Sequence, residues 1–216
     1  MINQKNILTE GLLRYLKPNE LQKIQSVKIG IGGAGGLGSN AAMMLVRTGF
    51  DKLEVLDFDI IEASNLNRQQ YYADEVGLSK VEVLEKRLLA INPDLRITIH
   101  KTKWSPGIGN QFFKDCDFIV EAFDQVDFKH QFVNFYHDRA KYIVSGVGMA
   151  GLLEKQPMKI KKMGNIYFAG DITTCAHKGN PPMAPRVTMC AAMMAEIILD
   201  LTLGIPLHFS NNSRDT

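Results

Sequence analysis

A glycine-rich stretch between an apolar run and a helical pattern constrains this chain more than any other feature. The stretch reads KIGIGGAGGLGS; the apolar segment Val27–Ile31 at its start predicts a buried strand, and Ser39–Thr48 has helical periodicity. Gly33, Gly35 and Gly38 have the GxGxxG spacing. Glycines permit a tight turn and a close approach of backbone to phosphate, and the N-terminus of the following helix offers unpaired N–H groups. The stretch therefore predicts a phosphate-binding loop.

Beyond this loop, apolar runs that predict strands alternate with longer segments of helical periodicity. The further strands are Leu53–Leu56, Arg96–Ile99, Phe118–Glu121 and Tyr142–Val147, and the further helices are Lys80–Ile91, Phe128–Arg139 and a terminal helix that starts at Pro185 and stops at Gly204. This alternation predicts an α/β fold with a doubly wound, Rossmann-like and mainly parallel sheet. Beyond Gly148 the apolar pieces are short and poorly periodic, and we expect a mixed or antiparallel extension there.

The length of the chain bounds its domain organisation. Its 216 residues, 45% of them hydrophobic and 22% charged, suffice to bury one substantial core. We expect a single domain over residues 1–209, with a nucleotide-binding half at 27–148 and a substrate-facing half at 149–204. Residues 210–216 are polar and predict a disordered tail.

Charge, hydropathy and cysteine content argue against several other classes. The net charge is +2, and the sequence contains no block of like charges. It therefore does not indicate an extended charged surface for binding nucleic acid or an acidic membrane. No apolar run approaches the ~20 residues of a membrane-spanning helix. Three cysteines, Cys116, Cys175 and Cys190, lie far apart without a CxxC pair, so we expect neither a disulfide framework nor a zinc site. A cytoplasmic protein fits these features.

The glycine loop alone does not distinguish ATP from NAD. Asp57 closes the second predicted strand, where a carboxylate can accept hydrogen bonds from the ribose hydroxyls of either nucleotide. An NAD-dependent oxidoreductase therefore stays open at this point as an alternative function.

Three charged residues favour ATP. A triphosphate that is cleaved needs cations around it, and Arg68 and Lys80 are candidates. Asp124 follows the fourth predicted strand, at the carboxyl edge where doubly wound folds bind ligands. Magnesium prefers oxygen ligands, so Asp124 is a candidate magnesium ligand.

With these motifs the sequence resembles the ThiF/MoeB/HesA family, the ubiquitin-activating-enzyme-like adenylyltransferases, from Val27 to Gly204. The family's GxGGLG stands at Gly33–Gly38, its D-x-D followed by S-N-L-x-R-Q at Asp57–Gln69, and its lysine at Lys80. The short length and the ending MAPRV before the terminal helix resemble the smaller ThiF-like subgroup of thiamine biosynthesis.

The resemblance implies an activity and a set of site residues. The implied reaction is ATP- and magnesium-dependent adenylation of the C-terminal glycine carboxylate of a ThiS-like ubiquitin-like sulfur-carrier protein, carried out by a homodimer. Arg68, Lys80 and Asp124 would be catalytic, with Asp124 holding magnesium. The implied ATP-binding residues are Gly33, Gly35, Gly36, Gly38, Asp57, Asp59, Asn65, Arg68, Gln69, Lys80, Asp124 and Gln125.

The chain also departs from the family's pattern. Larger members carry two CxxC pairs for zinc and this chain has none, so no zinc is expected. Gln125 follows Asp124 where the family commonly has asparagine, and Lys129 stands near a family arginine. Arg14 is the only candidate upstream of the glycine loop for the arginine that relatives donate across a dimer interface.

Cys175 lies in a loop where some relatives carry a sulfur-transfer cysteine. Lys178 and protonated His177 are its neighbours and would favour the thiolate, so we treat Cys175 as a candidate reactive thiol beside the alternative of an incidental loop residue. Cys116, Cys190 and Trp104 are interpreted as packing residues.

Three further functions stay open beside the sulfur carrier and the oxidoreductase. ThiF-like relatives activate a modified tRNA adenosine for dehydration or a molybdopterin carrier, and a non-catalytic binding module would keep the fold alone. The presence of every charged site residue favours an enzyme.

Overall fold

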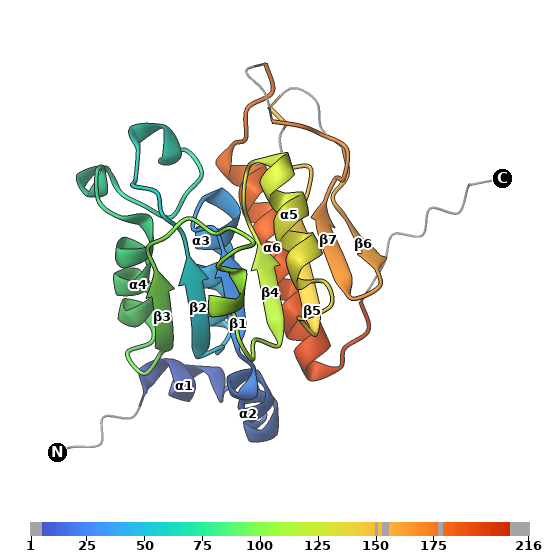
Figure 1. Ribbon diagram of the computed structural model, residues 1–216. Helices are drawn as coiled ribbons and strands as arrows, with labels where there is room; N and C mark the ends of the chain where they lie inside the picture. The colour runs from blue at the N-terminus through green and yellow to red at the C-terminus, as the bar shows by residue number, and fades with distance from the viewer. Residues whose placement is uncertain (1–5, 150, 153–155, 177–178, 208–216) are drawn as a thin grey trace.

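Seven strands form one sheet with the order β3-β2-β1-β4-β5-β7-β6 (Figure 1). The computed structural model describes residues 6–149, 151–152, 156–176 and 179–207, so the predicted tail at 210–216 lies outside the described residues. The strands are β1 (Ile29–Gly32), β2 (Lys52–Leu56), β3 (Arg96–His100), β4 (Phe118–Glu121), β5 (Tyr142–Gly146), β6 (Lys159–Met163) and β7 (Ile166–Gly170). All neighbours pair in parallel except β6, which pairs antiparallel with β7. The predicted α/β class and the antiparallel extension are thereby confirmed.

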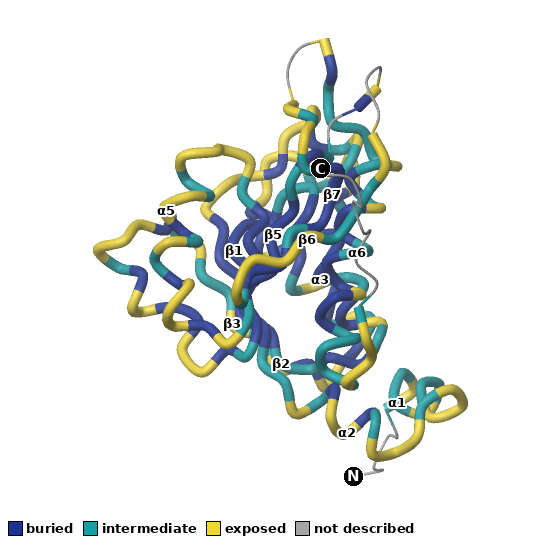
Figure 2. The backbone as a smooth tube through the Cα atoms, turned by 90° about the vertical axis from the view of Figure 1, so that its right-hand side faces the viewer, coloured by how far each residue is buried: buried dark blue, intermediate teal, exposed yellow. Residues whose placement is uncertain are grey.

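The helices cover both faces of this sheet. They are α1 (Ile7–Leu12), α2 (Pro18–Ser26), α3 (Gly36–Arg47), α4 (Lys80–Ile91), α5 (Val126–Tyr136) and α6 (Ala184–Leu203), with short 3₁₀ turns at Ala63–Asn65, Ala73–Glu75 and Gly109–Gln111. Figure 2 shows the buried strands between α5 on one side and α3 and α6 on the other. None of the described helices combines the length and apolar character needed to span a bilayer.

The strand order creates a topological switch between β1 and β4. From β1 the chain winds outward through β2 to β3, then returns to the other side of β1 and continues through β4 to β5. Connections between neighbouring parallel strands are right-handed, so the reversal places helices on opposite faces and leaves a crevice at the carboxyl ends of β1 and β4. This crevice is where the fold positions a ligand.

Two apolar clusters fill the layers on either side of the sheet. The first packs aliphatic residues of β1 and β2 against α3, α4 and α6. The second is aromatic: Trp104 makes edge-to-face contacts with Phe128, Phe132 and Phe135, at centroid distances of 5.6, 5.1 and 5.6 Å. Phe132 on α5 is fully buried at the centre of this cluster. The aromatic cluster therefore fastens α5 and the long β3–β4 connection to the sheet.

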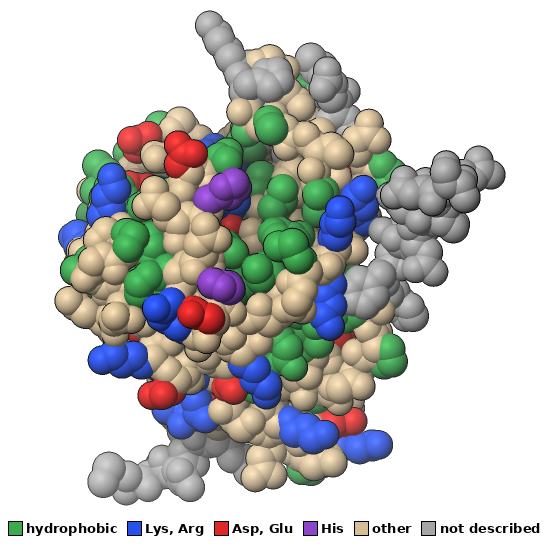
Figure 3. Space-filling model, turned by 45° about the vertical axis from the view of Figure 1, so that its right-hand side comes forward, with side chains coloured by type: hydrophobic (Ala, Val, Ile, Leu, Met, Phe, Trp, Pro, Cys, Tyr) green, Lys and Arg blue, Asp and Glu red, His purple; other side chains and the backbone are tan. Residues whose placement is uncertain are grey.

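The outermost strand, β6, carries a charged edge. Its sequence is KIKKM, and Lys161, Lys162 and Met163 are exposed. Figure 3 shows Lys and Arg side chains along the right-hand margin of the molecule, beside apolar ones. Lysines on an edge strand oppose pairing with a strand of another molecule. The charge on β6 thus limits the sheet to its own strands.

Most predicted elements agree with the structure to within three residues. Helix α4 and strand β4 have the predicted bounds, whereas α3 begins at Gly36 instead of Ser39 because the glycines themselves form its first turn. Helices α1 and α2 and strands β6 and β7 were not predicted as separate elements, although an antiparallel extension was expected beyond Gly148. These elements are short, and neither the helical nor the strand periodicity emerges over so few positions.

We expect Phe132→Ala to lower the free energy of unfolding by about 3–5 kcal/mol, because it opens a cavity in a fully packed aromatic cluster. Urea unfolding of the purified protein measures this. Tyr15→Ala is the control, since Tyr15 is 88% exposed and its loss should change the free energy by less than about 0.5 kcal/mol. A loss under about 1 kcal/mol at Phe132 would contradict the packing described above.

Candidate active site

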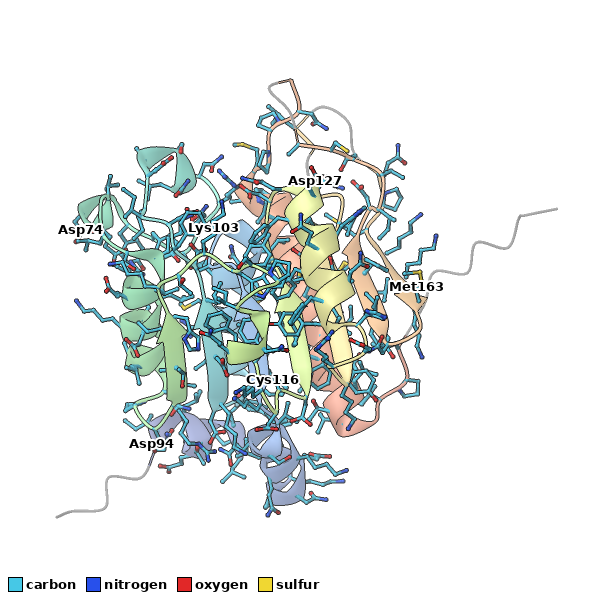
Figure 4. The ribbon with its side chains drawn as sticks, in the orientation of Figure 1. Asp74, Asp94, Lys103, Cys116, Asp127 and Met163 are labelled. Atoms are coloured by element: carbon cyan, nitrogen blue, oxygen red, sulfur yellow. The ribbon has the colours of Figure 1, made fainter. Side chains whose placement is uncertain are left out.

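A cavity of about 380 Å³ opens at the carboxyl edge of the sheet. Its walls come from the glycine loop, the ends of β2, β4 and β5, the first residues of α4, α5 and α6, and the segment after β7. In Figure 4, Lys103 and Asp127 lie toward this edge, whereas Asp94 and Cys116 lie toward the opposite end. The cavity therefore occupies the switch-point crevice.

A larger hollow of about 840 Å³ lies at the opposite end, beside α1. It is lined by apolar side chains such as Ile7 and Leu12, with Arg47 and Asp94 as its charged residues. It contains no glycine-rich turn and no helix N-terminus that faces a strand end. We therefore assign the nucleotide site to the smaller cavity, on chemistry and not on size.

The glycine loop is held in one conformation by contacts on both sides. Gly33 has a φ of +98°, and a Cβ on Gly38 would lie 1.8 Å from the carbonyl oxygen of Gly33, so both positions require glycine. The Ala34 carbonyl accepts a hydrogen bond of 2.7 Å from the Tyr71 hydroxyl. The Ala34 N–H donates to Asp57 Oδ2 at 2.6 Å. The loop is thus preorganised without a ligand.

Asp57 directly follows the last residue of β2 and is buried, with 7% of its surface exposed. Burial raises the pKa of its carboxyl group, while hydrogen bonds from the N–H groups of Ala34 and Asp59 oppose that effect. Each carboxylate oxygen already accepts one backbone hydrogen bond, to Oδ2 from Ala34 at 2.6 Å and to Oδ1 from Asp59 at 2.8 Å. Each keeps a lone pair for a ribose hydroxyl at the cavity wall.

Four cationic residues of the described chain line the cavity, and the two predicted ones among them, Lys80 and Arg68, differ in how they are held. Lys80, the first residue of α4, is buried and pairs with Asp59 at 2.8 Å between Nζ and Oδ2. Arg68 donates to the Ser64 carbonyl at 3.0 Å and to Asn67 Oδ1 at 2.7 Å, both of them uncharged acceptors. Arg68 makes no ion pair within the described residues, so its charge is available to an anion.

Asp124 and Gln125 line the cavity at the turn between β4 and α5. Asp124 is exposed and makes no ion pair with another described residue. Glu121, at the end of β4, is fully buried. It pairs with Lys129 at 2.8 Å and accepts a 2.6 Å hydrogen bond from the Ser145 hydroxyl. These contacts fix the start of the turn that carries the Asp124 carboxylate.

The residues fit a nucleotide with a triphosphate. A Cβ on Gly35 would meet only Gln69 Nε2 at 3.8 Å, so the space beside this backbone is open cavity. Gln69 Oε1 is buried without a hydrogen-bond partner in the described structure, which marks a polar atom that a ligand would satisfy. Magnesium needs only one or two carboxylates besides phosphate oxygens and water, and Asp124 supplies one.

The structure places most of the predicted site residues on this cavity. Gly33, Gly35, Gly36, Asp57, Asp59, Arg68, Gln69, Lys80, Asp124, Gln125 and Cys175 all line it. Asn65 does not, because its Oδ1 accepts the Glu62 N–H at 3.1 Å within its own turn. Gly38 packs beneath the loop against Gly33. Arg14 is exposed and does not line the cavity.

Sequence reasoning missed Lys103 as a cavity residue, and it named Trp104 only for packing and Lys129 only for its place near a family arginine. Lys103 and Trp104 come from the irregular segment after β3, and Lys129 holds the Asp124 turn through Glu121. A single lysine in an irregular segment carries no pattern, but the FxxEAFD run at the end of β4 placed Glu121 beside the predicted Asp124. Trp104 is 1% exposed and packs as predicted.

The three cysteines have different surroundings. Cys116 and Cys190 are buried, and burial raises the pKa of each thiol to about 12, which fits the predicted packing role. Cys175 is exposed and lines the cavity. The neighbours His177 and Lys178 lie outside the described residues. Cys175 is therefore the one thiol of the chain that a bound reactant could reach.

The model of the ThiF family matches residues 9–215. The chain belongs to this family. The "Probable molybdopterin-synthase adenylyltransferase" of Porphyra purpurea is 31% identical over 172 residues, which are 79% of this chain and 40% of that protein. The "Ubiquitin-like modifier-activating enzyme 5" of Caenorhabditis elegans is 42% identical over 82 residues, 38% of this chain and 20% of that enzyme. The predicted family resemblance is confirmed, and with it the ATP interpretation of the glycine loop is favoured over NAD.

Solved structures share the fold of this ThiF-family chain. The E. coli tRNA N6-threonylcarbamoyladenosine dehydratase TcdA in complex with AMP has a TM-score of 0.81 and 21% identity, covering 90% of this chain and 93% of that one. E. coli MccB with AMPCPP and MccA has a TM-score of 0.72 and 20% identity, covering 94% of this chain and 65% of that one. The chain spans 18%, 20% and 40% of the length of three curated relatives, so their activities are not transferred as a whole.

We expect Gly35→Val to weaken ATP binding at least about tenfold, or about 1.4 kcal/mol, because its side chain would occupy the open space beside the loop. Gly35 has φ −79° and ψ −148°, outside the usual helical and extended regions, so the melting temperatures of variant and parent are compared first to separate loss of folding from loss of binding. Trp104, the chain's only tryptophan, lines the cavity and reports binding by fluorescence. Gly107→Val is the matched control, and equal ATP affinity in both variants would place the phosphates elsewhere.

Proposed function

We propose that this chain adenylates the C-terminal glycine carboxylate of a ThiS-like ubiquitin-like sulfur-carrier protein, using ATP and magnesium, in the formation of the thiamine thiazole. The observation that carries the adenylation part is the joint placement of Arg68, Lys80 and Asp124 around a preorganised glycine loop in one cavity. The sulfur-carrier part rests on the resemblance to the short ThiF-like subgroup and on family membership.

The proposed reaction needs no covalent bond to the enzyme. A carboxylate oxygen of the carrier's C-terminal glycine attacks the α-phosphorus of ATP, the bond from that phosphorus to the bridging oxygen of the β-phosphate breaks, and pyrophosphate leaves. The products are an acyl adenylate and pyrophosphate. The protein's work is to align the carboxylate with the phosphorus and to stabilise the charge that develops on the leaving group.

Each group of the cavity has a place in this scheme. Asp57 would accept the ribose hydroxyls, and the backbone of the loop with the N-terminus of α3 would bind the phosphates. Arg68, which lacks an acidic partner among the described residues, would contact the triphosphate directly. Lys80 would do so while paired with Asp59. Magnesium held by Asp124 would supply charge neutralisation on the phosphate oxygens.

The full assembly is proposed to be a homodimer in the cytoplasm. Arg14 lies at the opposite end of the chain's sheet from the cavity, beside α1, so it could serve a site only in another subunit. Cys116 and Cys190 are buried free thiols, in keeping with a reducing compartment.

The acceptor is tested by pyrophosphate release in the presence of ATP and magnesium. We expect release with a ubiquitin-like carrier ending in Gly-Gly, and none with the same carrier truncated by its last glycines. A second candidate acceptor, a modified tRNA adenosine, is favoured by the near full-length match to the TcdA fold. Phosphate or pyrophosphate release that depends on tRNA and not on the carrier would replace the sulfur carrier as substrate. Pyrophosphate release that depends on a molybdopterin carrier would keep the adenylation reaction and change only the pathway that it serves.

Asp124→Ala should abolish carrier-dependent ATP–pyrophosphate exchange, because it removes the free carboxylate proposed to hold magnesium. Asp127→Ala is the matched control: Asp127 is an exposed aspartate three residues on, outside the cavity lining, and its exchange rate should equal that of the parent. Near-normal exchange in Asp124→Ala would remove Asp124 from the mechanism.

Cys175 is proposed to take part in sulfur transfer after adenylation, because it is an exposed thiol on the cavity wall. Its thiolate would attack the acyl carbon of the adenylate and displace AMP, with the thiol proton released to solvent. Mass spectrometry of the protein after turnover with the carrier, with and without a sulfur donor, should find Cys175 joined through a thioester to the carrier's C-terminal glycine. Cys175 unmodified throughout turnover would reject this role and leave adenylation untouched.

A further inference from the structure

The segments that directly follow the parallel strands β5 and β7 stay in close contact beside the cavity. A Cβ on Gly170 would lie 1.8 Å from the Val147 carbonyl oxygen, and one on Gly148 would lie 2.2 Å from Asp171 Oδ1. The Asp171 N–H donates to the Gly148 carbonyl at 3.0 Å, and the Ile172 N–H to the Val147 carbonyl at 3.2 Å. The two segments therefore touch backbone to backbone before they diverge along the cavity wall.

Asp171 organises the segment that follows this contact. It is 1% exposed, and its Oδ1 accepts hydrogen bonds from the N–H groups of Thr173 at 3.0 Å and Thr174 at 2.8 Å. Its Oδ2 accepts the Thr174 hydroxyl at 2.7 Å. Burial opposes ionisation of this carboxyl group, but these hydrogen bonds and the neighbouring Arg186 lower its pKa below the ordinary value. One carboxylate thus fixes the turn that leads to Cys175.

Arg186, near the start of α6, completes this arrangement. Its Nη2 donates to Asp171 Oδ2 at 2.6 Å and to the Gln156 carbonyl at 3.0 Å, and 12% of its side chain is exposed. A buried carboxylate and guanidinium that are hydrogen-bonded to each other and to backbone groups hold their segments in a defined geometry. Arg186 therefore joins α6, the segment after β7 and the segment before β6.

The joined segments make up one wall of the cavity. Gly148, Met149, Thr174, Cys175, Ala176 and Val187 line this wall. Val187 approaches the glycine loop, since a Cβ on Gly36 would lie 3.0 Å from Val187 Cγ1. The wall therefore borders the space beside the glycine loop, where an incoming carboxylate would meet the α-phosphate of an ATP bound there.

We propose that Asp171 and Arg186 are positioning residues that hold this wall in the conformation that receives the acceptor's carboxylate tail. The inference rests on the proposed adenylation, and it assigns the pair to acceptor binding and not to ATP binding. Neither side chain contacts the glycine loop, Arg68 or Lys80 within the described structure. Loss of the pair should loosen the Thr173–Ala176 segment while α6 stays packed through its buried apolar face.

The test compares Arg186→Gln, Arg186→Lys and Asp171→Asn with Arg87→Gln. Arg87 is the matched control, because it pairs with Glu75 at 2.6 Å and is 13% exposed in its side chain, but neither it nor Glu75 belongs to the cavity wall or holds a segment of it. The first readout needs no acceptor: the rate of hydrogen exchange at the Thr173 and Thr174 N–H groups, which donate to Asp171, followed by mass spectrometry. We expect about tenfold faster exchange in Arg186→Gln and Asp171→Asn, with Arg186→Lys in between and Arg87→Gln unchanged.

The second readout is kinetic and uses a Gly-Gly-ending carrier that supports pyrophosphate release. Arg186→Gln should raise the KM for the carrier about tenfold, while the KM for ATP and the Trp104 fluorescence titration with ATP stay within about twofold of the parent. A variant that had merely lost stability would change both KM values. Recovery of the carrier KM toward the parent in Arg186→Lys, which keeps the positive charge, supports positioning.

The outcomes separate this inference from the proposed function. Parental exchange rates at Thr173 and Thr174 in both Arg186→Gln and Asp171→Asn would overturn the positioning role even if adenylation is intact. Faster exchange with an unchanged carrier KM would overturn the link to the acceptor. If the parent protein adenylates no carrier, the proposed function fails and the acceptor role fails with it, whereas the exchange rates still decide whether the pair holds the wall.

Discussion

The hydrogen bond from the Ala34 N–H to the Asp57 carboxylate ties the end of β2 to the glycine loop that follows β1. Because β1 and β2 are parallel neighbours, their carboxyl ends lie at the same edge of the sheet. The hydrogen bond between the residues that follow them fixes the conformation of the glycine loop. Tyr71 holds the other side of the same residue through the Ala34 carbonyl. The conformation of the glycine loop, the first turn of α3 and the position of the Asp57 carboxylate, proposed to bind ribose, all depend on this pair of contacts. A preorganised site of this kind loses little conformational entropy when a nucleotide binds.

The cavity divides into two walls of different construction. The wall of Asp57, Arg68 and Lys80 belongs to the part of the sheet in which strands and helices alternate regularly. The other wall comes from irregular segments after β5 and β7, and buried polar contacts define its shape in place of regular secondary structure. Chemistry shared by a family would be expected on the first wall, and selection among acceptors on the second.

How much of this structure the sequence predicts depends on whether the residues of a feature form a local pattern in the chain. The parallel strands and α4 have periodic apolar patterns, and the glycine loop, Arg68 and Lys80 stand in local motifs, so their place on the cavity was predictable. The Asp171–Arg186 pair joins residues 15 positions apart across a segment without periodicity, and no local pattern marks it. Asn65 belongs to a local motif as well, but its side chain bonds within its own turn and does not line the cavity.

Lys80 is the first residue of α4, so a buried cation stands at the end of the helix where the aligned peptide dipoles already concentrate positive charge. Its pairing with Asp59, whose side chain is 46% exposed, offsets this repulsion in part. Folding would be easier with an acidic or neutral side chain at that position. An anion that entered the cavity would offset the same repulsion, so nucleotide binding there and the stability of α4 would be thermodynamically coupled.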